Sequence, residues 1–195
     1  MISTLSKKHN FDIVFDSQKV FRLVLEAMSN PSRIVSIKEC ADKLFGNRAA
    51  FLALAMTLLD NEVSFSACDN QPLSNDIASL TLAKRDEVNA ADFVFVDNPK
   101  DMETVIENVK CGTLDEPHKS ATIVILNDDV PVNPLTLWGP GIYGRIDINT
   151  STTVKNAIKL RDAQHYEYPQ GIDLLFVTSS GDLFAIPRLT RMEAK

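Results

Sequence analysis

The chain has 195 residues, of which 45% are hydrophobic and 24% charged, and this ordinary balance excludes an intrinsically disordered protein. Its net charge is −6, and residues 51–148 hold sixteen acidic but only six basic residues, so no nucleic-acid groove is expected there. No apolar run reaches the roughly 18 residues that cross a bilayer, and the N-terminus lacks the apolar stretch of a signal peptide. We therefore expect a cytoplasmic protein with no membrane or nucleic-acid partner.

This length predicts a single domain over residues 1–195, with an irregular N-terminus over 1–10 and a C-terminal tail over 189–195. The cysteines and histidines are scattered and form neither a C-x-x-C pair nor an H-E-x-x-H motif. Neither a disulfide framework nor a metal site is therefore predicted, and we interpret the cysteines as buried, reduced thiols. The residues concerned are Cys40, Cys68, Cys111, His9, His118 and His165.

The first predicted helix covers residues 17–29, with Asp16 or Ser17 as its cap, and it ends before Pro31. Its apolar residues recur at helical spacing, which predicts one buried face. That face consists of Val20, Phe21, Val24, Leu25 and Met28. A second helix over 47–59 is apolar nearly all round and is expected at the centre of the molecule.

Short apolar segments then alternate with helices along the rest of the chain. Helices are predicted over 75–82, 101–109 and 151–164. Strands are predicted over 34–37, 63–67, 91–96, 121–126, 135–138, 142–148, 172–178 and, as the last one, 183–186. Several of these strands are apolar on both faces, which predicts an α/β fold with helices on both sides of a mixed sheet, a three-layer αβα arrangement.

Most motifs that carry chemistry are missing from the sequence. There is no phosphate-binding G-x-x-x-x-G-K-[ST] loop, no G-x-G-x-x-G and no G-x-S-x-G. The glycine-rich segment Gly139-Pro140-Gly141 either presents backbone amides to an anion or is a turn between strands. Asp128 and Asp129 form a carboxylate pair in a polar turn, and we interpret them as solvated.

Asp173 lies in an otherwise apolar strand, where an unpaired carboxylate is costly, and Arg188 follows the last predicted strand. If Ser180 and Gly181 form a two-residue turn, Asp173 and Arg188 lie directly opposite each other on the hairpin. A slip of one residue in that register would place the two side chains on opposite faces. We interpret Asp173 and Arg188 as a pair that is either structural or part of a site.

Several short motifs follow one another in a fixed order along residues 11–192. The first half of the chain contains Phe21-Arg22, Ala27-Met28-Ser29, Pro31, Pro72-Leu73-Ser74-Asn75-Asp76-Ile77 and Ala91-Asp92-Phe93. The second half contains Gly112, Pro117, Ala121-Thr122, Gly139-Pro140-Gly141-Ile142, Pro169, Gly171-Ile172-Asp173-Leu174, Ala185-Ile186-Pro187-Arg188 and Thr190. In order and spacing these motifs resemble the H subunit family of the bacterial carbon–phosphorus lyase machinery, PhnH. Two positions depart from the family pattern, because Ser32 replaces a usual glycine and Leu189 a usual threonine.

The resemblance implies a role in the use of alkylphosphonates. The family's assembly contains G, H, I and J subunits, and with an associated ATP-binding-type protein it replaces the adenine of ATP by a phosphonate, giving ribose 1-phosphonate 5-triphosphate. The resemblance further implies an accessory subunit that forms a homodimer when isolated and has no securely assigned catalytic residue. It also implies a fold like that of pyridoxal-phosphate-dependent transferases without the cofactor's lysine. It adds Arg22, Asn75 and Asp76 to the candidate site residues.

The residues themselves leave other functions open. A stand-alone α/β enzyme would bind a nucleotide or phosphonate near Gly139-Pro140-Gly141, and a generic dimerisation module would bind neither. The lysines fall in polar or helix-end settings, so we expect no pyridoxal phosphate, which needs a lysine for its Schiff base. We also expect the isolated chain to show no turnover with ATP and methylphosphonate, because no nucleophile–base pair or phosphate loop is visible.

Overall fold

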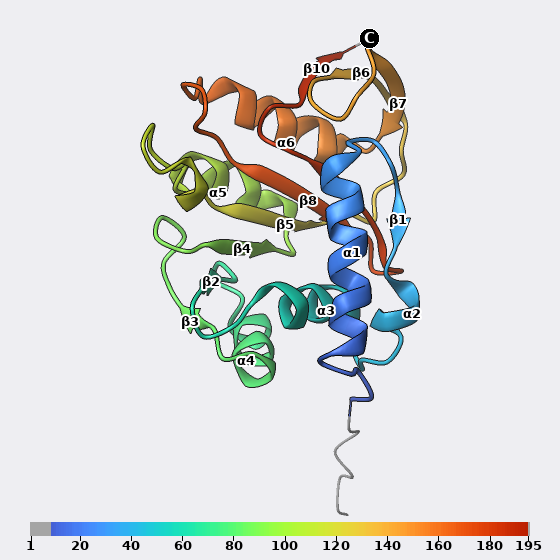
Figure 1. Ribbon diagram of the computed structural model, residues 1–195, viewed down its shortest axis with the longest axis vertical. Coiled ribbons are helices and arrows are strands. Elements are labelled where there is room, and N and C mark those ends of the chain that lie inside the picture. The colour runs from blue at the N-terminus through green and yellow to red at the C-terminus, as the bar shows by residue number, and fades with distance from the viewer. Residues whose placement is uncertain (1–8, 195) are drawn as a thin grey trace, which may run out of the picture.

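The computed structural model describes residues 9–194, so most of the predicted irregular stretch 1–10 lies outside the described residues. The helices are α1 (Phe15–Ser29), α2 (Lys38–Ala41), α3 (Ala49–Leu58), α4 (Gln71–Leu80), α5 (Met102–Asn108), α6 (Thr152–Ala163) and the short 3₁₀ turns η1 (Pro99–Asp101) and η2 (Pro117–Lys119). The strands are β1 (Val35–Ser36), β2 (Ser64–Ser66), β3 (Lys84–Arg85), β4 (Phe93–Val96), β5 (Thr122–Leu126), β6 (Asn133–Trp138), β7 (Ile146–Thr150), β8 (Asp173–Val177), β9 (Asp182–Ile186) and β10 (Arg191–Ala194). Figure 1 shows their arrangement.

The described strands form a seven-stranded sheet in the order β1-β9-β8-β5-β4-β2-β3 and a separate three-stranded sheet in the order β10-β6-β7. In the large sheet β3, β2, β4, β5 and β8 run parallel, whereas β9 is antiparallel to both β8 and β1. The prediction of an α/β fold with a mixed sheet is therefore confirmed. In the part of the chain described, no helix combines the length and hydropathy needed to cross a membrane.

Helices cover both faces of the large sheet. Residues of α1, α2, α3 and α4 pack into one hydrophobic cluster, and residues of α5 and α6 pack into a second. Strand β5 divides its side chains between the two, with Val124 in the first cluster and Ile123 and Ile125 in the second. This division explains why the central strands are apolar on both faces.

The prediction that 183–186 is the last strand is wrong, because residues 191–194, within the predicted C-terminal tail, form β10. This strand pairs antiparallel with β6, and Arg191 lies opposite Trp138. Two of its four residues are charged, so the segment carries little intrinsic strand signal. Its conformation is set by pairing with β6, which lies about fifty positions away in the sequence. The hydrophobic pattern of residues 191–194 alone does not predict this pairing.

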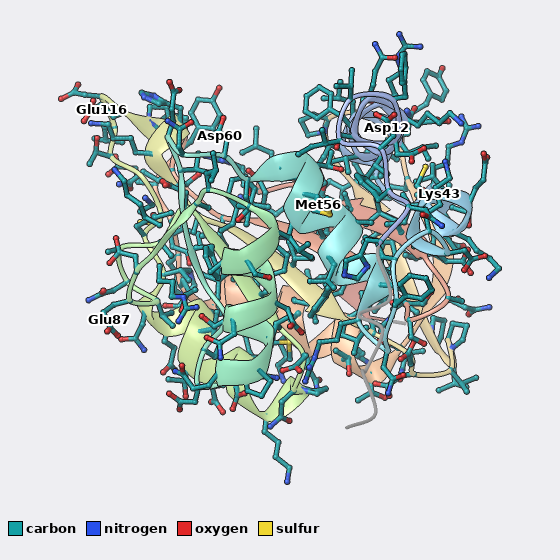
Figure 2. The ribbon with its side chains drawn as sticks, turned by 90° about the horizontal axis from the view of Figure 1, so that it is seen from below. Asp12, Lys43, Met56, Asp60, Glu87 and Glu116 are labelled. Carbon is teal, nitrogen blue, oxygen red and sulfur yellow. The ribbon has the colours of Figure 1, made fainter. Side chains whose placement is uncertain are left out.

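Two helix starts also differ from the prediction. At α1 the cap is Asp12, whose Oδ1 accepts hydrogen bonds from the amides of Val14 and Phe15, rather than Asp16 or Ser17. Asp16 is instead buried against Lys43, with its Oδ1 2.6 Å from Nζ, and Figure 2 shows Asp12 and Lys43 at this end of the helix. Burial by itself raises the pKa of Asp16, but the hydrogen bonds from Lys43 and from the Asp12 amide, together with the charges of Lys43 and Lys19, outweigh it and the pKa is lowered.

Helix α4 begins at Gln71, four residues before the predicted start. The side chain of Asn70 accepts a hydrogen bond from the amide of Leu73 and so caps the helix, with Pro72 in its first turn. Both residues are typical of helix N-termini. The predicted start of this helix at residue 75 is therefore wrong.

The predicted buried face of α1 is only partly correct. Val20 and Val24 are buried together with Ala27, and α1 packs on α3 and β9. Phe21 and Leu25, however, are 45% and 51% exposed. The predicted stripe was too wide, because the contact with α3 and β9 covers only the side of the helix that carries Val20, Val24 and Ala27.

The turn after α1 keeps a conformation that suits glycine. Ser32 has φ +90°, in the left-handed region that costs a residue with a Cβ atom free energy. No hydrogen bond of the Ser32 side chain is present to offset this cost. Ser32 therefore holds a strained backbone conformation that a glycine would adopt at lower cost.

We predict that Ser32→Gly stabilises the protein by about 1 kcal/mol, because glycine adopts positive φ without the steric cost of a Cβ. Urea unfolding at equilibrium measures the change. Ser32→Ala is the matched control, since alanine keeps the Cβ and should bring no gain. Equal stability of the glycine and alanine variants would show that this backbone is not strained.

Candidate functional site

The structure brings together Asp173 at the start of β8 and Arg188 beyond the end of β9. Arg188 Nη2 lies 2.5 Å from Asp173 Oδ2, and Nε lies 3.2 and 3.3 Å from the two carboxylate oxygens. The backbone amide of Arg188 also donates to Asp173 Oδ1 at 2.8 Å. Asp173 is only 8% exposed, so this charged pair is largely withdrawn from water.

The pair forms by a route different from the predicted one. The hairpin pairs Val177 with Leu183 and Leu174 with Ile186, one residue away from the predicted register. The turn is longer than two residues, because the amide of Thr178 donates to the carbonyl of Asp182. Arg188 lies past the last ladder pair and is not bound to the alternation of faces within β9, so its side chain reaches Asp173 despite the slip.

Arg188 also joins segments that are remote in the sequence. Its Nη1 donates to the carbonyl of Pro117 at 2.7 Å, and its Nη2 donates to Ser120 Oγ at 2.5 Å. A Cβ atom on Gly171 would lie 2.9 Å from Arg188 Cβ, so glycine is needed where this arginine packs. Both terminal nitrogens of the guanidinium are thus engaged by the protein, which favours the structural interpretation of the pair.

The segment Gly139-Pro140-Gly141 is a turn wedged between two other parts of the chain. The amide of Ile142 donates to the carbonyl of Gly139 and closes it. A Cβ atom on Gly139 would lie 2.8 Å from the carbonyl oxygen of Leu189, and one on Gly141 would collide with the carbonyl oxygen of Ser29. Both glycines have positive φ. The sequence left an anion site and a turn open, and the geometry favours the turn.

A cavity of about 310 Å³ lies where these segments meet. We call this place the junction; it comprises the end of α1, the glycine turn and the segment after β9. The cavity is lined by Met28, Ser29, Pro140, Gly141, Asp173, Pro187, Arg188, Leu189 and Thr190. The first, middle and last motifs of the predicted family signature thus meet at one place.

Sequence reasoning missed Arg161, the most important side chain behind the junction. It is 1% exposed, and its guanidinium donates to the carbonyls of Ile186, Pro187 and Thr190 as well as to Asp162. Burial lowers the pKa of Arg161, although Asp162 opposes the shift. A signal was present, because Arg161 continues the buried spacing of Val154 and Ile158 along α6.

The remaining candidates lie elsewhere. Arg22 is exposed on α1, and Asn75 and Asp76 are exposed on α4. Asn75 Oδ1 accepts a hydrogen bond from Arg85, and none of the three candidates lines a cavity described here. The structure does not bring them together with Asp173 and Arg188.

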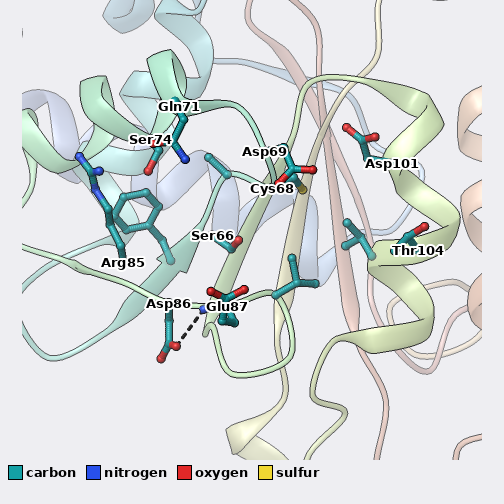
Figure 3. A pocket seen from close by; sticks show the side chains of 14 residues that line it. Ser66, Cys68, Asp69, Gln71, Ser74, Arg85, Asp86, Glu87, Asp101 and Thr104 are labelled. Carbon is teal, nitrogen blue, oxygen red and sulfur yellow. Dashed lines mark hydrogen bonds between the residues drawn. The ribbon is translucent and has the colours of Figure 1, made fainter.

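Two larger cavities lie at the carboxyl ends of the parallel strands. One, of about 460 Å³, is shown in Figure 3 beyond β2 and β3, with carboxylates of Asp69, Glu87 and Asp101 around it. Burial, followed by the nearby carboxylates, raises the pKa of the Cys68 thiol there to about 12. A thiol that stays protonated is a poor nucleophile. The second, of about 560 Å³, lies beyond β5 and β8.

Metal binding finds no support in residues 9–194. No group of three or more histidine, cysteine, aspartate or glutamate side chains there is arranged to hold an ion. Chemistry at the junction is limited as well, since its charged groups pair with one another.

Comparison with known proteins gives two matches of nearly full length. The sequence model of the family described as "Bacterial phosphonate metabolism protein (PhnH)" matches residues 9–193. A protein of Rhizobium meliloti (strain 1021), alpha-D-ribose 1-methylphosphonate 5-triphosphate synthase subunit PhnH, is 26% identical over 189 residues, which cover 93% of this chain and 92% of the relative. The family match therefore includes every segment of the junction.

We predict that Asp173→Asn lowers the free energy of unfolding by about 3 kcal/mol, because it leaves the withdrawn cation of Arg188 without its counter-charge. Chemical denaturation measures the loss. Glu193→Gln is the control: it breaks the exposed pair with Arg145 and should cost less than about 1 kcal/mol. Unchanged stability of Asp173→Asn would contradict the structural interpretation and leave a functional one.

Proposed function

Because this chain belongs to the family of bacterial phosphonate metabolism proteins called PhnH, we propose that it is an accessory subunit of an alpha-D-ribose 1-methylphosphonate 5-triphosphate synthase. The observation that carries the proposal is the family match over residues 9–193, which leaves almost none of the chain for an unrelated activity. Its place of action would be the cytoplasm, with the whole chain folded as one domain.

An accessory role fits the chemistry of the described residues. Asp173 and Arg188 neutralise each other, and Arg161 is fully occupied by carbonyls and Asp162. The Cys68 thiol has a raised pKa, which makes it a poor nucleophile. In this reading the chain contributes a surface to the assembly, and the reacting groups are supplied by other subunits.

The outward face of α1 is the surface that we assign to a partner subunit. Phe21 and Leu25 lie one turn apart and are about half exposed, and Val14 and Phe15 continue the apolar surface at the start of the helix. Exposed large apolar side chains that cluster in this way mark interaction sites. The partners we propose are the G, I and J subunits of the assembly, and we propose a homodimer for the isolated chain.

The likeness to pyridoxal-phosphate-dependent transferases is a further proposal, as is the lack of the cofactor. The mixed seven-stranded sheet covered by helices on both faces is compatible with such a fold. Within residues 9–194 no lysine is buried, and none lines the three cavities described here. A Schiff-base lysine needs a sheltered setting that lowers its pKa, which supports a role without the cofactor.

We predict that Phe21→Asp/Leu25→Asp abolishes copurification with the G, I and J subunits, because each substitution puts a carboxylate where apolar surface should be covered. Affinity purification of the co-expressed subunits measures the loss. The control is Leu114→Asp, an exposed apolar residue in the loop between α5 and η2, which should copurify normally.

Light scattering of the isolated double variant shows whether the same face also holds a second copy. Wild-type chain that fails to copurify with any subunit, or that alone releases adenine from ATP in the presence of methylphosphonate, would contradict the accessory role. The second result would favour the stand-alone enzyme instead.

We predict that the purified chain, mixed with pyridoxal phosphate, shows no absorbance band of an internal aldimine. Borohydride reduction should then trap the cofactor on no single lysine. Peptide mapping after reduction is the measurement, and scattered low-level labelling of exposed lysines is the expected background. Stoichiometric trapping on one lysine would overturn the proposal.

A further inference from the structure

The cavity beyond β5 and β8 has the position of a ligand site. It measures about 560 Å³, within the usual range of roughly 300–1,000 Å³ for small-molecule pockets. Asn127 and Asp128 follow β5, Thr178 follows β8, and Thr150 and Ser151 connect β7 to α6. Ligands of open α/β sheets bind outside the carboxyl ends of the parallel strands, which is the edge formed here by β5 and β8.

One buried group in the cavity wall has no partner in the protein. Thr150 is 3% exposed, and its hydroxyl makes no hydrogen bond. Leaving a buried hydroxyl unpaired costs free energy, so such a group calls for an explanation. The next residue, Ser151, is satisfied, since its Oγ donates to Asn127 Oδ1 at 2.6 Å and accepts from the amide of Val154.

Helix α6 starts next to this wall, directly after Ser151. Helix α6 is twelve residues long, and its first amides have no acceptor within the helix. Ser151 satisfies only the amide of Val154. The backbone amide of Asn127 donates to the carbonyl of Val177, whereas its side-chain Nδ2 makes no hydrogen bond to a described residue. Asn127 and Thr150 both line the cavity.

The floor of the cavity is apolar: Phe184 is partly exposed there, whereas Phe176 beside it is only 1% exposed. Phe176 and Phe184 stack with their ring centres 4.9 Å apart and 15° between their planes. Ile148 and Pro131 extend this apolar surface along the wall. Aromatic and branched side chains of this kind bind the faces of planar rings.

The rim is acidic and carries no compensating cation. Asp128 is held by the amide and hydroxyl of Ser179, and Asp129 accepts from Thr153, so two carboxylates are fixed in place. Asp182 adds a third, and no lysine or arginine lines the cavity. An anion such as free phosphonate is therefore repelled, whereas hydroxyl and amino donors are favoured.

We propose that this cavity binds an uncharged nucleoside: a planar heteroaromatic base on the apolar floor and ribose hydroxyls at the carboxylate rim. Carboxylates are suitable acceptors for ribose hydroxyls. The Thr150 hydroxyl and the side-chain Nδ2 of Asn127 would pair with polar atoms of the ligand that reach the wall. This assignment goes beyond the proposed function, which gives the chain no ligand.

The test is isothermal titration of the full-length chain with adenosine. Wild type binds, and Thr150→Val binds about three- to tenfold more weakly, the effect of one lost hydrogen bond. Thr150→Val should unfold at the same temperature as wild type or higher, because it removes an unpaired hydroxyl. Thr190→Val is the matched control: it removes the other buried hydroxyl without a partner, at the junction, and should leave adenosine affinity unchanged.

A second series tests the acidic rim with ATP and methylphosphonate as probes. We expect ATP to bind wild type more weakly than adenosine does. In Asp182→Asn the ratio of the ATP to the adenosine dissociation constant should fall by about two- to threefold, because one repelling charge is removed. Methylphosphonate alone does not bind. No adenosine binding to wild type, equal binding to Thr150→Val, or binding of methylphosphonate in preference to adenosine each overturns the proposal. If the nucleoside proposal fails but the accessory role holds, Thr150→Val still copurifies with the other subunits. Loss of copurification by wild type would instead show that the accessory role fails.

Discussion

Between Ile186 and Arg191 the chain leaves one sheet and enters the other, and the buried guanidinium of Arg161 holds that crossing in place. Backbone carbonyls in such a gap have no strand partner, and a buried cation is costly unless it is well paired. Arg161 meets both requirements at once, because three of these carbonyls accept its hydrogen bonds and Asp162 balances its charge. The start of β10 and the position of Arg188 both depend on this arrangement.

The amino and carboxyl ends of the parallel strands β5 and β8 differ in how tightly their surroundings are packed. At the amino end of β8, Asp173 and Arg188 are packed against Gly171 and hydrogen-bonded to segments from elsewhere in the chain. At the carboxyl ends of β5 and β8 there is open volume, an apolar floor and a hydroxyl without a partner. The charged pair at the amino end of β8 is mutually satisfied and resists rearrangement, whereas the larger cavity at the carboxyl ends has room for a ligand.

Local pattern was enough to predict the helices and strands that form the core. The stripe of α1, the all-round apolarity of α3 and the apolar runs of β4, β5 and β8 each follow from burial, which a sequence records directly. The cap at Asn70 and the strand β10 were missed. The first depends on one side-chain hydrogen bond, and the second on a distant partner strand.

The candidate site was predictable in its members but not in its geometry. Asp173 and Arg188 stood out because charge inside an apolar run needs compensation, and this argument holds whatever the register. The register itself failed by one residue, because it depends on turn length, which Ser180-Gly181 does not determine. Arg161 was not predicted, although it follows Val154 and Ile158 at helical spacing. An arginine is expected to be exposed unless partners for its charge are known, and the carbonyls that bind Arg161 are visible only in the structure.

The residues that carry the family resemblance also bear on where chemistry can take place. Met28-Ser29, the glycine turn, Asp173, Arg188 and Thr190 meet at the junction, where a Cβ on either glycine would strike backbone. Motifs gathered at such a place specify how three segments of chain pack together. The motifs that identify the family are therefore motifs that shape the fold. They do not mark the position of a reacting group. Within the described residues the junction and the cavity beyond β5 and β8 each contain a threonine hydroxyl without a partner, but the second cavity is larger, about 560 Å³ against about 310 Å³. A reacting group is therefore to be sought there or on the partner subunits.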